Sequence, residues 1–381
     1  MSHTNSSALS SSGLSYSLDA ALFQKSPALS SSVSVASASS ATSSAAPTSL
    51  TGRPISHDSL RAKYESILNS RNSTDRELRE SLKKLRMLVV MNGMPDNSDD
   101  PTPQHGCSLK GRVWKCLLGV YSLSAKDYSR LIDKGPCDVY DKIKNDTFRT
   151  MATDRKFTKR VQENMLSRAL NAFVWKVKEL PTHRLLNLKF SYVQGMNVLM
   201  APFLYCMPEL DAFHAYAQFI QHVCPLYVQP AMEGVHCGVK LLEQCLKILD
   251  PELYSHLKRK KVEATVYAFP SVLTLCACTP PLSELLKLWD FLLAYGVHLN
   301  ILCIVAQLMM MRTKLLSRPS PGSLLRTLPP LNAKEISAIT IALVPQLPDD
   351  LYDWLARHPY DATIYEQMIP ELEEEEKELG W

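Results

Sequence analysis

The stretch Ser283-Glu-Leu-Leu-Lys-Leu-Trp-Asp-Phe-Leu-Leu-Ala-Tyr-Gly296 shows most clearly how this 381-residue chain folds. Its apolar residues recur at the spacing of one helix face: Leu285, Leu288, Trp289 and Leu292. The serine at its start is a favoured N-cap residue, and the glycine at its end suits the left-handed conformation that closes many helices. The stretch therefore predicts a helix bounded by Ser283 and Gly296.

Helical patterns continue on both sides of this stretch. Apolar residues at helical spacing predict further helices within residues 57–88, 113–120, 161–177 and 336–343. Capping pairs and helix-ending residues accompany these runs: Ser124 with Asp127, Gly135-Pro136, Asn332 with Glu335, and Pro345. The 13 glycines include no Asn-Gly or Asp-Gly turn between alternating runs, which leaves little material for β-hairpins. Only residues 262–269 favour a strand, and a buried helix fits them equally, so we predict an all-α fold.

The first 50 residues differ in composition from the rest. They contain 19 serines, and Asp19 and Lys25 are the only fully charged residues among them. Such a stretch cannot pack a core, so we expect it to be disordered. Ser26-Pro27 is a minimal proline-directed phosphorylation site, and an inert tail is the simpler alternative. We expect a Ser/Ala-rich leader at 1–55, a helical region at 56–103, the main domain at 104–316, C-terminal helices packed on it at 317–368, and an acidic tail at 369–381.

Composition excludes several classes of function. The net charge of only +4 argues against nucleic acid or an anionic membrane as the main partner, and the basic run at 258–261 lacks interleaved aromatic residues. The ten cysteines form no Cys-x-x-Cys pair and follow no secretory signal, which indicates reduced, buried thiols in a cytoplasmic protein. The spacing of Cys276 and Cys278 does not suit zinc, so we expect no metal site. The longest apolar run, at 301–311, is too short to span a membrane, so we expect no membrane insertion.

Two short polar segments stand out where ordinary catalytic motifs are missing. The chain has no nucleophile elbow, zinc-protease helix, phosphate loop or dinucleotide-binding motif, and so we expect no nucleotide or cofactor site of its own. The first segment is Ile143-Lys-Asn-Asp146-Thr-Phe-Arg149-Thr150, whose Asp146 and Arg149 can pair on one helix face. The second is Ser191-Tyr192-Val193-Gln194-Gly195-Met196-Asn197. Its glycine allows an unusual backbone angle that presents the glutamine sharply.

These two segments resemble the hallmark motifs of the TBC-domain family, Ile-x-x-Asp-x-x-Arg followed by Tyr-x-Gln-Gly. The resemblance includes Arg112 and Trp114 in an opening motif, and Trp289 and Asp290 in the stretch quoted first. It covers residues 104–316, and four motifs in the right order make coincidence implausible. We assign Trp114, Trp289 and Asp290 to packing and hydrogen bonding in the core. The resemblance implies a TBC-type helical domain.

For this family the resemblance implies a GTPase-activating protein with two fingers. Arg149 would enter the site of a partner GTPase and neutralise charge developing on the phosphate oxygens, while Gln194 would orient the attacking water. Asp146 would hold the arginine segment, and Tyr192, Gly195 and Asn197 would support the glutamine loop. The partner would be a small Ras-like or Rab-like GTPase, which itself binds Mg-GTP.

Details of both motifs resemble the fungal mitotic-checkpoint members of the family, the "budding uninhibited by benzimidazole" type. That similarity implies a Ras-like GTPase of mitotic exit or septation, a second activator subunit or scaffold, and recruitment to the spindle pole body. The second subunit would dock outside the groove that receives the GTPase, with the 57–88 helices taking part. Val193 replaces the usual cysteine, and Met151-Ala152 stand where a proline often follows, which weakens the case for a Rab substrate. The alternatives are a Rab activator in membrane traffic and a catalytically idle TBC interaction module.

Overall fold

The computed structural model describes residues 56–72, 74–95, 106–180 and 188–368. All regular elements in these ranges are helices, so the all-α prediction is confirmed. The expected leader at 1–55 and acidic tail at 369–381 lie outside the described residues. Among the residues described, no helix is long and apolar enough to cross a membrane.

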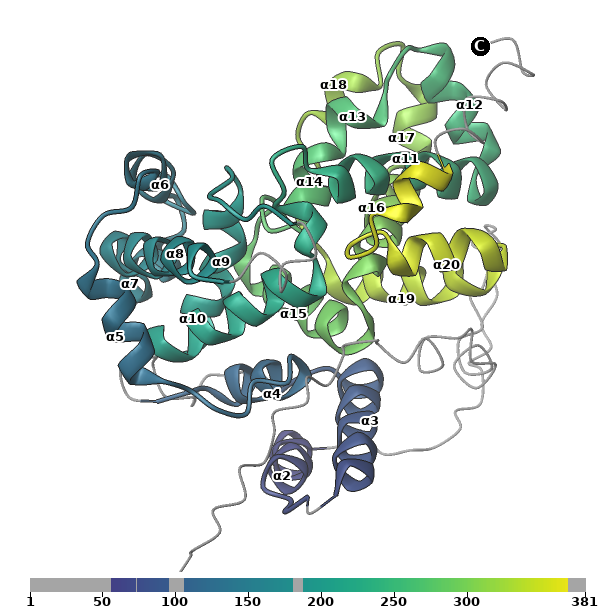
Figure 1. Ribbon diagram of the computed structural model, residues 1–381. Coiled ribbons are helices and arrows are strands. Elements are labelled where there is room, and N and C mark those ends of the chain that lie inside the picture. Colours follow the sequence, from purple (N-terminus) through teal and green to yellow (C-terminus); the bar gives the residue numbers. More distant parts are fainter. Residues whose placement is uncertain (1–55, 73, 96–105, 181–187, 369–381) are drawn as a thin grey trace, which may run out of the picture.

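Two N-terminal helices, α2 (His57–Leu68) and α3 (Asp75–Asn92), lie at one end of the molecule (Figure 1). Thr74 begins α3 with a reciprocal capping box, in which the side chains of Thr74 and Glu77 each accept a backbone N–H of the other residue. Helix α3 packs on α15, where Arg86 donates a 2.8 Å hydrogen bond to the carbonyl of Ala294. The N-terminal helices are therefore joined to the main body.

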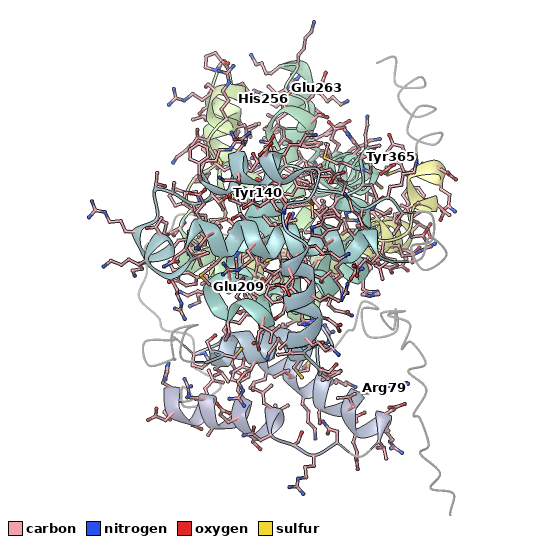
Figure 2. All side chains as sticks on the ribbon, turned by 60° about the vertical axis from the view of Figure 1, so that its left-hand side comes forward. Arg79, Tyr140, Glu209, His256, Glu263 and Tyr365 are labelled. Atoms are coloured by element: carbon pink, nitrogen blue, oxygen red, sulfur yellow. The ribbon has the colours of Figure 1, made fainter. Side chains whose placement is uncertain are left out.

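The chain then builds one half of the body, on the left of Figure 1. Its helices are α4 (Leu109–Leu117), α5 (Ala125–Asp133), α6 (Tyr140–Thr147), α7 (Arg155–Arg160), α8 (Glu163–Lys178), α9 (Met196–Cys206) and α10 (Glu209–Gln218). Side chains fill the space between these helices (Figure 2). Glu209 on α10 shows how they are joined, because it accepts 2.6 Å hydrogen bonds from Tyr128 on α5 and Arg168 on α8.

The other half contains the remaining helices, with α15 between the two halves (Figure 1). They are α11 (Glu233–Leu249), α12 (Pro251–Arg259), α13 (Ala264–Tyr267), α14 (Phe269–Leu273), α15 (Leu282–Tyr295), α16 (Asn300–Met310), α17 (Arg312–Ser317), α18 (Gly322–Leu325), α19 (Ala333–Leu343) and α20 (Asp349–Arg357). Helix α19 packs on both α15 and α16. One continuous core extends from Leu60 to Met368, so the segments outside 104–316 share the core of the main domain.

Some helix boundaries differ from the sequence-based expectation. Helix α15 begins at Leu282 with Pro281 as N-cap, so Ser283 is inside the helix and the predicted serine cap was wrong. Gly296 does follow the end of α15, with a φ of 155° that favours glycine. The ambiguous segment at 262–269 contains the short helix α13 and the start of α14. Pro345 lies in a 3₁₀ turn after α19, which ends at Leu343.

Two of the predicted capping pairs are present. The side chain of Ser124 accepts a hydrogen bond from the backbone N–H of Asp127, and that of Asn332 accepts one from the N–H of Glu335. The return contact of the second pair joins side chains, because Asn332 donates to Glu335 at 2.9 Å. Both helices therefore begin where the sequence places their caps.

A buried ion pair joins two helices of the core. Trp114 donates a 2.8 Å hydrogen bond from its indole Nε1 to Asp290, and Lys110, one helical turn earlier on α4, pairs with the same carboxylate. Trp114 also packs against Trp289, with ring centroids 5.8 Å apart. Burial raises the pKa of Asp290, and Lys110 opposes this effect. The pair joins α4 to α15, with the Lys110 and Asp290 side chains 7% and 4% exposed.

We expect Lys110→Met to destabilise the fold strongly, because it leaves the Asp290 carboxylate buried without its cation. Removing one partner of a buried pair typically costs about 3–5 kcal/mol. Urea unfolding followed by circular dichroism measures the loss. Asp138→Ala, which breaks the exposed contact with Lys178, is the control and should leave the unfolding midpoint unchanged. Equal urea-unfolding midpoints for wild type, Lys110→Met and Asp138→Ala would contradict a structural role for the buried pair.

Candidate functional site

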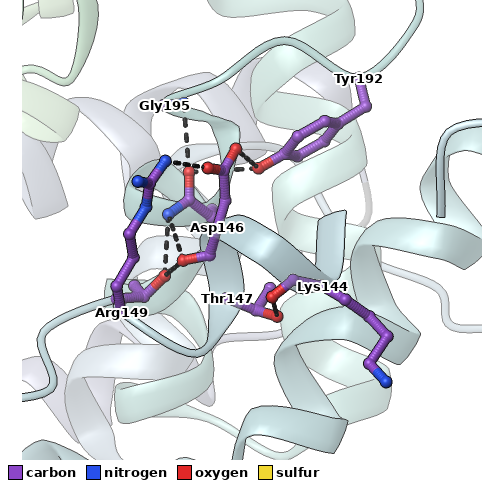
Figure 3. A network of polar contacts seen from close by, with 8 residues as sticks. Lys144, Asp146, Thr147, Arg149, Tyr192 and Gly195 are labelled. Carbon is purple, nitrogen blue, oxygen red and sulfur yellow. Dashed lines mark hydrogen bonds and ion pairs between the residues drawn. The ribbon is translucent and has the colours of Figure 1, made fainter. Parts of the chain in front are cut away.

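Arg149 lies directly after the end of α6. Helix α6 ends at Thr147 and is held by Ile143, which is fully buried. The Arg149 side chain is 55% exposed and pairs with Asp146 three residues earlier (Figure 3). This is the pairing that the sequence spacing predicted, although Arg149 itself lies one residue beyond the helix C-cap. The guanidinium is therefore both accessible to a partner and held in a defined position.

Asp146 connects the arginine segment to the glutamine segment. Its side chain is only 9% exposed, and its second carboxylate oxygen accepts a 2.8 Å hydrogen bond from the Tyr192 hydroxyl (Figure 3). Burial and the hydrogen bond to Asp146 raise the pKa of Tyr192, which therefore stays protonated and remains a donor. One carboxylate thus holds Arg149 on one side and Tyr192 on the other.

Asn197, in the first turn of α9, provides the second connection. Its amide nitrogen donates to the Thr150 hydroxyl at 2.8 Å and to the Asp146 carbonyl at 3.3 Å. Its amide oxygen accepts the backbone N–H of Gly195 at 3.1 Å (Figure 3). The Asn197 side chain therefore uses both its donor and its acceptor to fix the two segments against each other.

Gly195 shapes the turn that presents Gln194. It is the N-cap of α9, with a φ of 107° that L side chains rarely adopt. A Cβ atom added there would approach Leu273 Cδ2 to 3.0 Å. Gln194, the preceding residue, is exposed. The left-handed turn therefore directs the chain into a buried helix while leaving the glutamine at the surface.

Arg149 and Gln194 line the same open groove, which has a volume of about 610 Å³. Asp146, Gly195 and Asn197 also line it. The opposite wall is mainly apolar and comes from the α14 region and the start of α15: Phe269, Pro270, Leu273, Ala277, Leu282 and Leu285. We call this space the finger groove. It can accept a partner's surface while exposing one cation and one amide side chain to it.

The fold-motif residues lie elsewhere. Trp114, Trp289 and Asp290 are buried in the core, and Arg112 extends from α4 to α2, where it pairs with Glu65 at 2.8 Å. Two contributors were missed by sequence reasoning: Thr150 in the site and Lys110 in the core. Thr150 follows Arg149 in the first polar segment, so the sequence could have indicated it as a site residue. The four-residue spacing that places Lys110 and Trp114 on one face of α4 could have indicated the lysine.

All ten cysteines are free thiols. Across the described ranges, no group of three or more His, Cys, Asp or Glu residues is placed to hold a metal ion. Burial raises the pKa of the Cys206, Cys245 and Cys303 thiols to about 12. Cys278 is exposed, and Cys107 and Cys116 are only partly buried, which corrects the expectation that the thiols are all buried.

Comparison with known proteins defines the class. The helical fold matches the crystal structure of the Ypt/Rab-GAP domain of Gyp1p with a TM-score of 0.60 at 19% identity, covering 78% of this chain and 99% of that one. At this identity the likeness establishes the fold alone. The sequence profile of the Rab-GTPase-TBC domain matches residues 107–316. The chain therefore belongs to the Rab-GTPase-TBC domain family.

Within this family the chain is a TBC-domain GTPase-activating protein related to mitotic checkpoint proteins. It is 46% identical over 282 residues to cell division control protein 16 of Schizosaccharomyces pombe. The matched region covers 74% of this chain and 89% of that protein. It is 38% identical over 298 residues to mitotic check point protein BUB2 of Saccharomyces cerevisiae. This match covers 76% of this chain and 95% of that protein. The resemblance expected from the sequence motifs is confirmed, and a small GTPase is the partner that it implies.

Proposed function

We propose that this protein accelerates GTP hydrolysis on a small Ras-like GTPase by supplying Arg149 and Gln194 to its active site. The observation that carries the proposal is that these two exposed side chains line one groove and lie on segments joined by Asp146 and Asn197. Arginine is suited to this role because its permanent charge and planar fork match phosphate oxygens. The nucleotide and its magnesium ion belong to the GTPase, and this chain supplies only side chains.

The proposal is tested with a panel of purified Ras-like and Rab-like GTPases, each loaded with radioactive GTP. Single-turnover hydrolysis is followed with and without the chain. Strong stimulation of a Ras-like member supports the proposal, and preferential stimulation of Rab members favours the alternative of a Rab activator in membrane traffic. Tight binding to a GTPase without stimulation would indicate a catalytically idle interaction module.

We further propose that the protein acts in a mitotic checkpoint as one part of a two-component activator recruited to the spindle pole body. Two of its relatives, a mitotic check point protein and a cell division control protein, support a role in mitosis. A surface away from the finger groove would suit the second component. A shallow hollow of about 630 Å³ lies along α2 and α3, where Met87 and Met91 are 45% and 54% exposed. Lys63, Lys83 and Lys84 border it together with one acidic residue, Glu80. This positive balance favours an amphipathic partner segment with acidic flanks.

Met87→Glu with Met91→Glu should abolish binding of the second component. The two carboxylates would be buried in the apolar contact and would repel the acidic flanks of the partner segment. Deleting α2 and α3 is a weaker test, because α3 also packs on α15 in the core. The tagged protein is followed by microscopy through mitosis, together with recovery of its bound proteins. Val266→Glu, at an exposed apolar residue on α13, is the control. Spindle-pole signal that survives the double substitution would contradict this docking surface.

A further inference from the structure

A second hollow adjoins the finger groove. It has a volume of about 550 Å³ and shares Thr153, Asp154 and Leu282 with the groove as a common wall. We call it the basic pocket. Its charged lining consists of one acidic residue and five basic ones: Asp154, Lys110, Arg155, Lys156, Arg160 and Lys287. The pocket is therefore strongly cationic on a chain whose net charge is only +4.

Helix α7 supplies most of this charge and is held firmly. Phe157 is buried beneath it, and the Asp154 carboxylate accepts hydrogen bonds from the backbone N–H groups of Lys156 and Phe157, at 2.8 and 3.0 Å. Asp154 therefore serves as the helix cap. The side chains of Arg155 and Lys156 are exposed and form no ion pair within the part of the chain that the structure describes.

The other three cations of the pocket are already engaged. Lys110 pairs with buried Asp290, and Lys287 contacts Glu284 at 2.9 Å. Arg160 is partly buried, with its guanidinium carbon 4.7 Å from the centroid of the Tyr205 ring. Arg155 and Lys156 are thus the cations of the pocket that are most available to an incoming anion.

We infer that the basic pocket receives acidic side chains of the partner GTPase and steers the GTPase onto the finger groove. This inference rests on the proposed function. A folded protein that covers Arg149 and Gln194 must also reach the shared wall, since Thr153 and Asp154 lie only a few residues after Arg149. The cations gather in one pocket beside the groove and do not form a long stripe, which favours an acidic protein surface over nucleic acid. Opposite charges placed around a binding site mainly accelerate association.

The test is charge reversal by Arg155→Glu with Lys156→Glu. The probe is the GTPase that the wild-type chain binds most tightly in the panel, loaded with a non-hydrolysable GTP analogue. We expect the association rate constant to fall about tenfold or more at low salt, as for electrostatically steered complexes. The difference should shrink near 1 M salt, where the Debye length is about 3 Å. In single-turnover hydrolysis, the half-saturating concentration should rise while the rate at saturation changes less than about twofold.

Arg259→Glu with Lys260→Glu is the matched control, since it makes the same two changes at exposed residues at the end of α12, far from α7 (Figure 1). It should leave association unchanged. Replacing an acidic GTPase residue by lysine should restore binding to the Arg155→Glu, Lys156→Glu protein, called the α7 variant, and should not improve binding to wild type. Equal association by wild type and the α7 variant, or equal loss in the α12 control, would overturn the inference. Absence of stimulation by wild type would instead refute the proposed function, because binding is measured separately.

Discussion

Arg149→Ala should lower GTPase stimulation by about 10³-fold or more, the usual range for an arginine finger being ~10³ to 10⁵. In the proposed function its guanidinium neutralises charge that develops on the phosphate oxygens in the transition state. Arg149→Lys should lose most of the stimulation too, because an ammonium group cannot form the same bidentate contacts. Single-turnover hydrolysis at saturating concentrations of the chain measures both effects.

Lys144→Ala is the matched control for these substitutions. It removes a cation from α6 only a few residues away, and Figure 3 shows the Lys144 side chain directed away from the Asp146 and Arg149 pair. This variant should stimulate hydrolysis as wild type does. Circular dichroism checks that each variant is folded. Full stimulation by a folded Arg149→Ala protein would remove the arginine finger from the mechanism.

Gln194→Ala should slow hydrolysis by roughly 10²-fold, similar to the loss of a single transition-state hydrogen bond in other enzymes. The amide would orient the attacking water, so its loss affects the rate at saturation more than binding. Because the glutamine comes from the activator, the wild-type chain should also stimulate a GTPase whose own water-orienting glutamine has been replaced. The measurement is single-turnover hydrolysis together with binding of the GTP-analogue complex.

Gln162→Ala is the control for the glutamine prediction, because Gln162 is an exposed glutamine that makes no side-chain capping bond at the start of α8. It should behave as wild type. Wild-type rates with Gln194→Ala would leave a mechanism that uses Arg149 alone. A loss of binding equal to the loss of rate would assign Gln194 to the interface and not to the chemistry.

Helix content could be predicted from the sequence because burial on one face imposes a strong 3.6-residue period. Ser124 and Asn332 show that N-caps too can be read locally when a side chain closes the first turn. The start of α15 could not be read in this way. Pro281 takes the N-cap position with an extended ψ of 154°, so the helix begins at Leu282, two residues before the start that a cap at Ser283 would predict.

The contact between Asp146 and Arg149 could be predicted from the sequence, and the longer-range contacts of the candidate site could not. Spacing alone placed Asp146 beside Arg149, because residues three apart meet on a helix. It could not show that Asp146 also accepts from Tyr192, since that contact joins residues 46 positions apart. Nor could it show that α14 supplies the apolar wall of the finger groove. Such contacts depend on how whole helices pack, and no local pattern in a single sequence encodes them.

The carboxylate of Asp146 has a consequence for product release. In the free protein the guanidinium of Arg149 already has an anion as its partner. In the proposed mechanism, entry into the GTPase exchanges this carboxylate for phosphate oxygens, and the exchange is most favourable while the γ-phosphate is present. Once phosphate has left, Asp146 competes better for the guanidinium, because the remaining nucleotide offers less negative charge. Under the proposed mechanism, the ion pair that positions the arginine before the reaction would also favour dissociation after it, so that one activator would serve many GTPase molecules.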